Sequence, residues 1–313
     1  MKRTLSRFAV LLVASLLLPL SAHAQAFRTY LASYGNDGNP CSVGSPCRLL
    51  PAALNAVLDG GEIWILDSAN FNQGTVFITK NVSILAVPGQ LASIASVGAA
   101  EAINVSAPVK VRLRNVVIAD NANNHGTDGI VASNGANVFV EKSLIAARMI
   151  GINVNGARIS VSESTFRDSQ SAIRIKGNAS MDVSDSRFAS HSSWVIYFDG
   201  SVASTTTTGL LTNCSIADSF AGVDVYSNGS APSTLKLSVS RTSFSNVYYG
   251  IVSETAAGSG QVALATVGDS VFSQVGVALY SGGVGAGIET MGNNQARQVG
   301  TAASGNVTLV GSI

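Results

Sequence analysis

The sequence predicts an all-β protein in which short repeated strands stack into one parallel coil. Only 12% of the residues are charged, and 31 glycines accompany many β-branched residues and turn formers, a composition that favours strands and tight turns over helices. A six-residue pattern recurs along the chain, and a second strand with alternating apolar residues follows most copies. A unit this short cannot bury its apolar face by itself, so the copies must stack on one another.

The N-terminal segment 1–24 is set apart from this fold. Basic residues near the N-terminus precede the apolar run 8–20, and a small-residue cleavage site follows at 22–24. This order is typical of a secretory signal peptide. The apolar run is short for a membrane span and contains Pro19. We therefore expect a secreted or periplasmic protein that has no membrane span and begins at Gln25.

The charge of the remaining chain argues against nucleic acid as a partner. Removing residues 1–24 takes three of the 19 basic residues and none of the 18 acidic ones, which leaves a net charge of about −2. Nucleic-acid binding depends on Lys and Arg side chains that neutralise phosphates. A near-neutral surface does not provide them, and we expect no nucleic-acid partner.

Residues 25–60 are predicted to form an N-terminal cap that includes a disulfide loop. Two of the three cysteines lie in the segment NPCSVGSPC, where Cys41 and Cys47 flank a short loop that contains glycine and proline. In an exported protein such a pair most simply forms a disulfide. The third cysteine, Cys214, falls within the repeat and is treated with it below.

Residues 61–313 carry the repeat, in which an apolar residue, two polar or small residues, a small residue and any residue precede Phe or Ile. The last residues of successive copies lie 27, 21, 22, 28, 28 and 28 positions apart. Second strands such as GINVNG, AIRIKG and GVDVYS alternate with period two, so one face of each is buried. The seven copies are LRNVVI (113–118), VEKSLI (140–145), VSESTF (161–166), VSDSRF (183–188), LTNCSI (211–216), VSRTSF (239–244) and VGDSVF (267–272).

These units resemble the right-handed parallel β-helix repeats of the pectin lyase-like superfamily, over nearly the whole mature chain. The resemblance implies a single right-handed parallel β-helix solenoid with a short N-terminal capping helix. The segment PCRLLPAALNAVLDGGEIWILDSANF is similar to the cap of that superfamily, with a helix, then Gly-Gly, then the first strand. Leu50, Ala53, Leu54 and Val57 fall at helical spacing, and we expect them to cover the open end of the coil.

The repeat assigns three columns of inward side chains. The small-residue column contains Cys214, which we therefore interpret as a buried structural thiol with no catalytic role. The first column is Val140, Val161, Val183, Leu211, Val239 and Val267; the second is Ile145, Phe166, Phe188, Ile216, Phe244 and Phe272; the small-residue column is Ser143, Ser164, Ser186, Cys214, Thr242 and Ser270.

The segment Arg174-Ile175-Lys176 resembles a substrate-binding motif of the polygalacturonases. Those enzymes also carry a pair of adjacent aspartates and a Gly-His-Gly segment, and this sequence has neither. Hydrolysis of that kind needs two carboxyl groups in defined roles. The repeat alone explains the tripeptide, because Ile173 and Ile175 point inward while Arg174 and Lys176 point outward.

Outward residues of the second strands form two adjacent columns, because neighbouring parallel strands lie about 4.8 Å apart. Aromatic, amide and charged side chains on a flat sheet suit a sugar chain, so these columns are the candidate substrate-binding residues. The alternative is a solvated face on which Lys176 and Asp199 compensate each other. The first column is Asn153, Arg174, Tyr197 and Asp224; the second is Asn155, Lys176, Asp199 and Tyr226.

A polar column at the turn before the small residues supplies the candidate metal ligands. Glu163 and Asp185 are neighbours there on adjacent rungs, a position in which two carboxylates can share a cation. Pectate lyases of the resembling superfamily hold calcium with carboxylates at such a place. No cofactor is required by the sequence, and calcium is the one that it leaves open; the alternative is an ordinary polar turn column.

Two further segments differ from the compact repeat. The loop 119–129 delays a second strand and offers Asp120, His125 and Asp128 as candidates, against the alternative of a simple Asn/Gly-rich excursion. The C-terminal segment continues the repeat without an evident cap, which leaves oligomerisation through the last rung open.

Two functions follow from these residues. The first is an exported β-helix that presents a carbohydrate-binding or cell-surface interaction face without a complete catalytic constellation, with a polysaccharide or cell-surface glycan as its partner. The second is a carbohydrate-active enzyme, a polysaccharide lyase or glycoside hydrolase, as the resemblance implies. We favour the first because the residues complete none of the superfamily's motifs, and a fold alone does not define a function.

Overall fold

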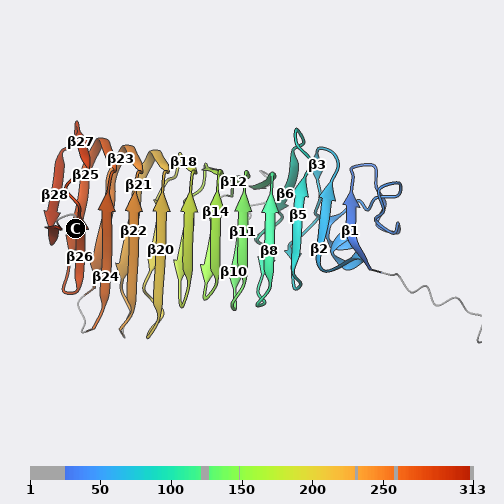
Figure 1. Cartoon of the computed structure of the whole chain (residues 1–313), viewed down its shortest axis with the longest axis horizontal. Helices are drawn as coiled ribbons and strands as arrows, with labels where there is room; N and C mark the ends of the chain where they lie inside the picture. Colours follow the sequence, from blue (N-terminus) through green and yellow to red (C-terminus); the bar gives the residue numbers. More distant parts are fainter. Residues whose placement is uncertain (1–24, 121–126, 148, 230–231, 257–259, 311–313) are drawn as a thin grey trace, which may run out of the picture.

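The computed structural model describes residues 25–120, 127–147, 149–229, 232–256 and 260–310. It is a right-handed parallel β-solenoid with a single short helix near its N-terminal end (Figure 1). The predicted signal peptide (1–24) and His125 lie outside the described residues. Among the residues that are described, no helix is long and apolar enough to cross a membrane.

Each turn of the solenoid contributes one strand to a first sheet of 12 parallel strands, whose arrows run side by side along the molecule (Figure 1). Its strands, in order, are β1 (Ala26–Leu31), β2 (Val57–Ile65), β5 (Val82–Ala86), β8 (Lys110–Arg114), β11 (Asn137–Glu141), β14 (Arg158–Ser162), β17 (Ser180–Ser184), β20 (Thr206–Thr212), β22 (Thr234–Ser240), β24 (Val262–Gly268), β26 (Ala286–Thr290) and β29 (Val307–Leu309).

The remaining 17 strands form two stacks that meet at a corner. The short-strand stack holds β3 (Ala69–Asn70), β6 (Ala92–Ser96), β9 (Val116–Asp120), β12 (Leu144–Ala146), β15 (Thr165–Arg167), β18 (Arg187–Ala189) and β27 (Gln295–Arg297). The second-strand stack holds β4 (Val76–Phe77), β7 (Ile103–Val105), β10 (Asp128–Ser133), β13 (Ile150–Asn155), β16 (Ser171–Lys176), β19 (Trp194–Asp199) and β28 (Thr301–Gly305). Three long strands belong to both stacks: β21 (Ser215–Ser227), β23 (Ser243–Thr255) and β25 (Val271–Gly282).

The three predicted inward columns lie in the core. Every described member of the apolar and small-residue columns is at most 5% exposed. Phenylalanines stack on adjacent rungs, with ring centroids 4.9 Å apart for both Phe166–Phe188 and Phe244–Phe272. The small column has a further role, because the hydroxyl of Ser164 accepts the backbone N–H of Ser143 on the preceding rung. Small hydroxyl residues therefore satisfy buried backbone donors at this corner.

The N-terminal end is closed by α2 (Leu50–Ala56), in which Leu50, Ala53 and Leu54 are buried as predicted. Val57 is buried too, but the expectation that it extends the helix is wrong, since it begins β2 in an extended conformation. The first strand also precedes the helix rather than following Gly-Gly: β1 pairs in parallel with β2. Over so few residues, the apolar pattern of a helix (period 3.6) cannot be told from that of a strand (period 2), so the sequence alone does not fix where the helix ends.

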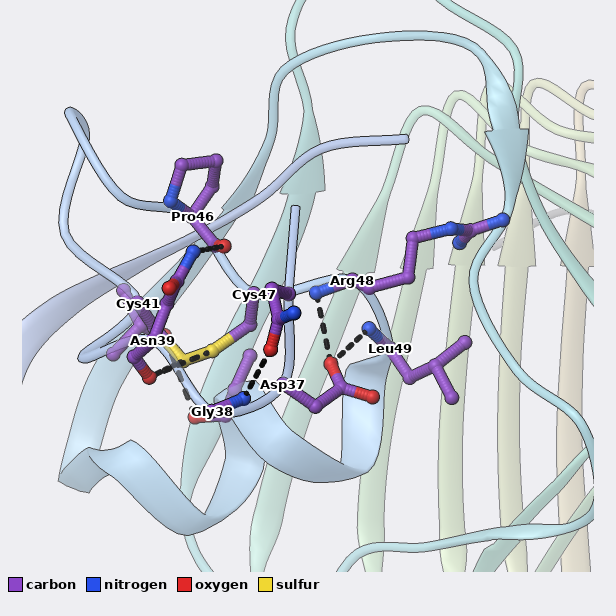
Figure 2. The surroundings of a disulfide bond; sticks show 11 residues. Asp37, Gly38, Asn39, Cys41, Pro46, Cys47, Arg48 and Leu49 are labelled. Atoms are coloured by element: carbon purple, nitrogen blue, oxygen red, sulfur yellow. Dashed lines mark hydrogen bonds between the residues drawn. A yellow bond between two sulfur atoms is a disulfide. The ribbon is translucent and has the colours of Figure 1, made fainter. Parts of the chain in front are cut away.

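The predicted disulfide is present and fixes the loop before the helix (Figure 2). Cys41 and Cys47 have Cα atoms 4.6 Å apart, within the usual range for a disulfide. Asp37 accepts the backbone N–H groups of Arg48 and Leu49, each at 2.8 Å, and so satisfies donors at the start of α2 (Figure 2). The loop and the helix thus form one connected cap.

The residue types of the polar turn column are explained by the backbone conformation at that turn. Its seven members, which include Glu163 and Asp185, all adopt left-handed φ values between 47° and 57°. Asn and Asp tolerate this conformation best among residues other than glycine. The column consists of Asn115, Lys142, Glu163, Asp185, Asn213, Arg241 and Asp269.

Candidate functional site

The outward side of the second-strand stack from β13 to β25, here called the second-strand face, holds both predicted columns. The register pairs Asn153 with Arg174, Arg174 with Tyr197, and Tyr197 with Asp224. The adjacent column is aligned as Asn155, Lys176, Asp199 and Tyr226. The predicted alignment is therefore correct through the irregular rung near Trp194.

An ion pair between Arg174 and Asp199 lies at the centre of this face. The guanidinium donates to Oδ2 of Asp199 from Nη2 at 2.5 Å and from Nε at 3.1 Å. The alternative in which Lys176 compensates Asp199 is wrong, because Asp199 pairs with Arg174 and, among the described residues, no ion pair joins Lys176 to Asp199. Arginine reaches diagonally to the neighbouring rung, and its planar guanidinium offers two donors to one carboxylate.

Burial and hydrogen bonds have opposite effects on Asp199. Its side chain is only 2% exposed, and burial by itself raises the pKa of a carboxyl group. Hydrogen bonds from Arg174 and from the backbone N–H of Ser201 outweigh that effect and hold the pKa of Asp199 below its ordinary value. Asp199 is thus ionised at neutral pH and is fixed in position.

Asp224 was predicted to point to solvent and is instead 4% exposed. Its Oδ1 is buried without a hydrogen-bond partner among the described residues. Burial, with a smaller contribution from the charge of Glu254, raises the pKa of Asp224 to about 8. Glu254 is half-buried, and burial raises its pKa as well. The face therefore combines an ionised Asp199 with an Asp224 that is largely protonated at neutral pH.

Tyr197 connects these charged groups. Its ring lies 5.8 Å from the Arg174 guanidinium. Burial, followed by the charges of Asp199 and Asp224, raises the pKa of Tyr197 above its ordinary value. Its hydroxyl group is therefore uncharged and can donate a hydrogen bond.

An aromatic cluster at one edge of the face was not predicted. The rings of Trp194 and Tyr249 stack at 5.8 Å across Ala221, which is fully buried beneath them. Phe220 and Tyr248 stack at 6.5 Å beside them and are 53% and 57% exposed. A signal was present, because Phe220 and Tyr248 have the same separation in the sequence as the inward residues Ile216 and Phe244.

The cluster continues toward the middle of the face through Tyr280. Its ring centroid lies 6.4 Å from that of Tyr249, and Tyr280 aligns through Val252 with Asp224 and Tyr197. Aromatic rings and carboxyl groups of four successive rungs therefore share one surface. We call Trp194, Phe220, Tyr248, Tyr249 and Tyr280 the aromatic cluster.

Of the three candidates in the loop 119–129, Asp120 and Asp128 are among the described residues. Asp128 accepts a hydrogen bond from Nδ2 of Asn153 at 2.8 Å, so it joins the first outward column. Burial raises the pKa of Asp128 and is only partly opposed by that hydrogen bond. Asp120, at the end of β9, accepts from the hydroxyl of Ser96.

The candidate metal ligands turn toward different partners. Lys142 lies 3.4 Å from Glu163, whereas Asp185 accepts from Nδ2 of Asn213 at 2.6 Å. A shallow hollow of about 510 Å³ follows this turn column past Asp185 and Arg241. Within the described ranges, no group of three or more His, Cys, Asp or Glu side chains is placed to hold a metal ion.

Cys214 occupies the small-residue column as predicted. It is 5% exposed, and its thiol donates to the backbone oxygen of Thr212 at 3.2 Å. Burial raises the pKa of this thiol to about 11. A thiol that stays protonated at neutral pH is a poor nucleophile, and Cys214 packs as a small apolar residue.

Several solved structures share this architecture at low sequence identity. The chain is similar to a pectin methylesterase from Aspergillus niger, with a TM-score of 0.56, 12% identity and 92% of each chain covered. It is similar to a pectate lyase, with a TM-score of 0.54, 13% identity, and 90% of this chain and 79% of that chain covered. An alginate lyase from Paenibacillus sp. str. FPU-7 gives 0.53 and 12%, with 90% of this chain and 100% of that one covered.

At these identities the likeness concerns the fold. None of the curated proteins matches the chain in sequence. Residues 101–289 match the family model described as a right handed beta helix region. Because that match covers more than half of the chain, the protein belongs to the right-handed β-helix family.

Proposed function

We propose that this protein is exported and binds a polysaccharide or cell-surface glycan on its second-strand face. The observation that carries the proposal is the aromatic cluster, in which two rings are more than half exposed on a flat sheet. Large exposed apolar side chains that gather in one place mark interaction sites on soluble proteins. Rings of this kind stack on the apolar faces of pyranoses.

The polar groups beside the cluster complement the hydroxyl groups of a sugar chain. Tyr197, Tyr226 and Lys176 are partly exposed on the same face. The Arg174–Asp199 pair is fixed by two hydrogen bonds. Equivalent positions repeat about every 4.8 Å along the solenoid. An extended chain that lies along the axis would thus meet a regular series of donors and acceptors.

Export rests on two features of the chain. Residues 1–24 have the order of a signal peptide. The Cys41–Cys47 disulfide fits an oxidising compartment, either the periplasm or the cell exterior.

The proposal is tested by affinity electrophoresis of residues 25–313 in gels that contain one polysaccharide each, from a panel of neutral, amino and uronate polymers. We expect retardation by at least one polymer. Tyr248→Ala should abolish it, whereas Tyr34→Ala, at a tyrosine that is 72% exposed outside the face, should not. Migration that no polymer changes would refute the proposal.

The second candidate is a carbohydrate-active enzyme, a polysaccharide lyase or glycoside hydrolase, and one observation favours it. Asp224 and Asp199 occupy one face with pKa values moved in opposite directions, which is how a general acid and an ionised carboxylate are distinguished in glycosidases. Release of reducing ends from the same panel tests it. The assay is repeated with added calcium and with a chelator to test Glu163 and Asp185. Substitution of these two residues should change the release of reducing ends only if calcium takes part in the reaction.

A further inference from the structure

The second-strand face changes its charge along the solenoid. Its cations, Arg174 and Lys176, both lie on β16, and Arg174 is neutralised by Asp199. Residues 194–199, 220–227, 248–255 and 276–282, which form the next four rungs of the face, contain no Lys or Arg. They contain three carboxyl groups and most of the rings. This end of the face therefore combines carboxyl groups and aromatic rings and has no cation of its own.

Within this end, one carboxyl group lacks the partners that burial normally requires. Asp224 is 4% exposed, and its Oδ1 has no hydrogen-bond partner among the described residues. A buried polar atom left in this state is costly, and each case calls for an explanation such as a ligand. Glu254 lies on the next rung, in the adjacent column, and is half-buried. The charge of Glu254 acts on Asp224 and adds to the effect of burial on the pKa of Asp224.

The rings around these carboxyl groups present π-faces. Tyr197 lies one rung before Asp224, and Tyr280 lies two rungs after it in the same column. Tyr249 contacts the Tyr280 ring at 6.4 Å. Cations are attracted to aromatic faces, and ammonium ligands are recognised by rings combined with carboxylates.

We propose that this end of the face binds a glycan that carries free amino groups, with an ammonium held by Glu254 and by the unpartnered Oδ1 of Asp224, on the two rungs between those of Tyr197 and Tyr280. The inference rests on the proposed glycan binding and specifies its ligand. A uronate chain would find no positive side chain on these four rungs. A neutral chain would offer no opposite charge to Glu254.

The test compares three probes with the mature protein by isothermal titration calorimetry at pH 6: a β-1,4-linked glucosamine hexamer, its fully N-acetylated form and a galacturonate hexamer. The first two share one backbone and differ in charge. We expect the glucosamine hexamer to bind about tenfold more tightly than the acetylated one, a difference of about 1.4 kcal/mol, and the galacturonate hexamer to bind most weakly.

Single substitutions then test which carboxyl groups bind the ammonium. Glu254→Gln should lower the affinity for the glucosamine hexamer to that for its acetylated form, and Asp224→Leu, which removes the acceptor oxygen, should do the same. Asp182→Asn, at an exposed aspartate on the first sheet, should change neither affinity. A thermal unfolding curve for each variant excludes misfolding as the cause. Equal binding of pentalysine would overturn the inference, because it would show attraction to any polycation.

The two proposals fail in different ways. If the acetylated or galacturonate hexamer binds as tightly as the glucosamine hexamer, the glycan-binding face stands and its preference for amino groups is refuted. If none of the three hexamers binds and no polymer of the panel retards the protein, both proposals fail.

Discussion

Compact and extended rungs of the same solenoid differ in a way that locates the candidate site. The repeat is shorter between Ile145 and Phe188 than between Phe188 and Phe272, although the inward columns are the same in both regions. The extra length of the extended rungs lies between the second strand and the next strand of the first sheet. The strands of the first sheet are longer in the extended rungs as well. The strands β20, β22 and β24 have seven residues each, whereas β11, β14 and β17 have five (Figure 1).

The additional residues form loops that follow the second strands and contact each other. Ser233 donates to the backbone oxygen of Gly200 at 3.1 Å, and its hydroxyl lies 2.6 Å from that of Ser227. The backbone N–H of Ser204 donates to Pro232 at 2.6 Å. Insertions in repeat proteins often map to the binding face, and here the longer turns belong to the same rungs as the aromatic cluster and the buried carboxyl groups.

Removing one core phenylalanine from each region is the substitution with the largest expected effect. Phe166 lies in a compact rung and Phe244 in an extended one, and each is fully buried and stacked on the next phenylalanine at 4.9 Å. We expect Phe166→Ala and Phe244→Ala each to cost about 3–5 kcal/mol of unfolding free energy. Urea denaturation measures both. Losses that differ by more than about 2 kcal/mol would contradict a common core.

Arg174→Ala should have the next largest effect. It leaves the carboxylate of Asp199 buried without its cation, at a cost of about 2 kcal/mol, which is less than for a fully buried pair because Arg174 is 37% exposed. Thermal unfolding compares it with Arg158→Ala on the exposed side of the first sheet. Adding Asp199→Asn to Arg174→Ala should restore part of the loss. No recovery in the double variant would mean that the charge is not the cause.

The pH dependence of stability should identify Asp224 in the extended rungs. Its folded-state pKa is about 8, above the ordinary 3.8, so the folded state holds the proton more tightly than the unfolded state does. The associated stability is complete below about pH 4 and is lost as pH rises toward 8. Asp224→Asn should therefore lose about 4 kcal/mol less than the wild type between pH 5 and pH 8. Parallel curves for the two proteins would contradict the assignment.

The smallest effect is expected at the turn column of the compact rungs. Lys142 and Glu163 are 48% and 58% exposed and lie 3.4 Å apart. Exposed pairs of this kind contribute about 0.5 kcal/mol or less, so Lys142→Ala should leave the midpoint of urea unfolding almost unchanged. A loss above about 1 kcal/mol would indicate that this column is more than a solvated turn.

The repeat made the fold and the rung register predictable, because period two and the recurring small residue are local signals. Ser164 and Cys214 fall at one position of the pattern, and both are buried there. The N-terminal end was predicted less well. A helix and a strand share the few residues around Val57, and β1 pairs with β2 across the disulfide loop and the helix between them, which no local pattern reveals.

The sequence predicted which way the side chains of the candidate site point, but not how deeply they are buried. Alternation indicated that Asp199 and Asp224 leave the core, but whether an outward side chain is exposed depends on its neighbours across rungs. The partner of Asp199 is a diagonal contact with Arg174, while the pattern favoured the lateral neighbour Lys176. Phe220 and Tyr248 lie at the corner between the stacks, outside the alternating segments that sequence reasoning used.

The most direct test of glycan binding at the second-strand face is the fluorescence of Trp194. The chain has two tryptophans, so Trp64→Phe, on the first sheet, leaves Trp194 as the only one. Titration with the oligosaccharide form of the polymer that retards the protein should change the Trp194 emission with saturation. The change should disappear with Tyr248→Ala and persist with Tyr34→Ala. Binding detected by calorimetry with unchanged Trp194 emission would place the glycan elsewhere and contradict the account.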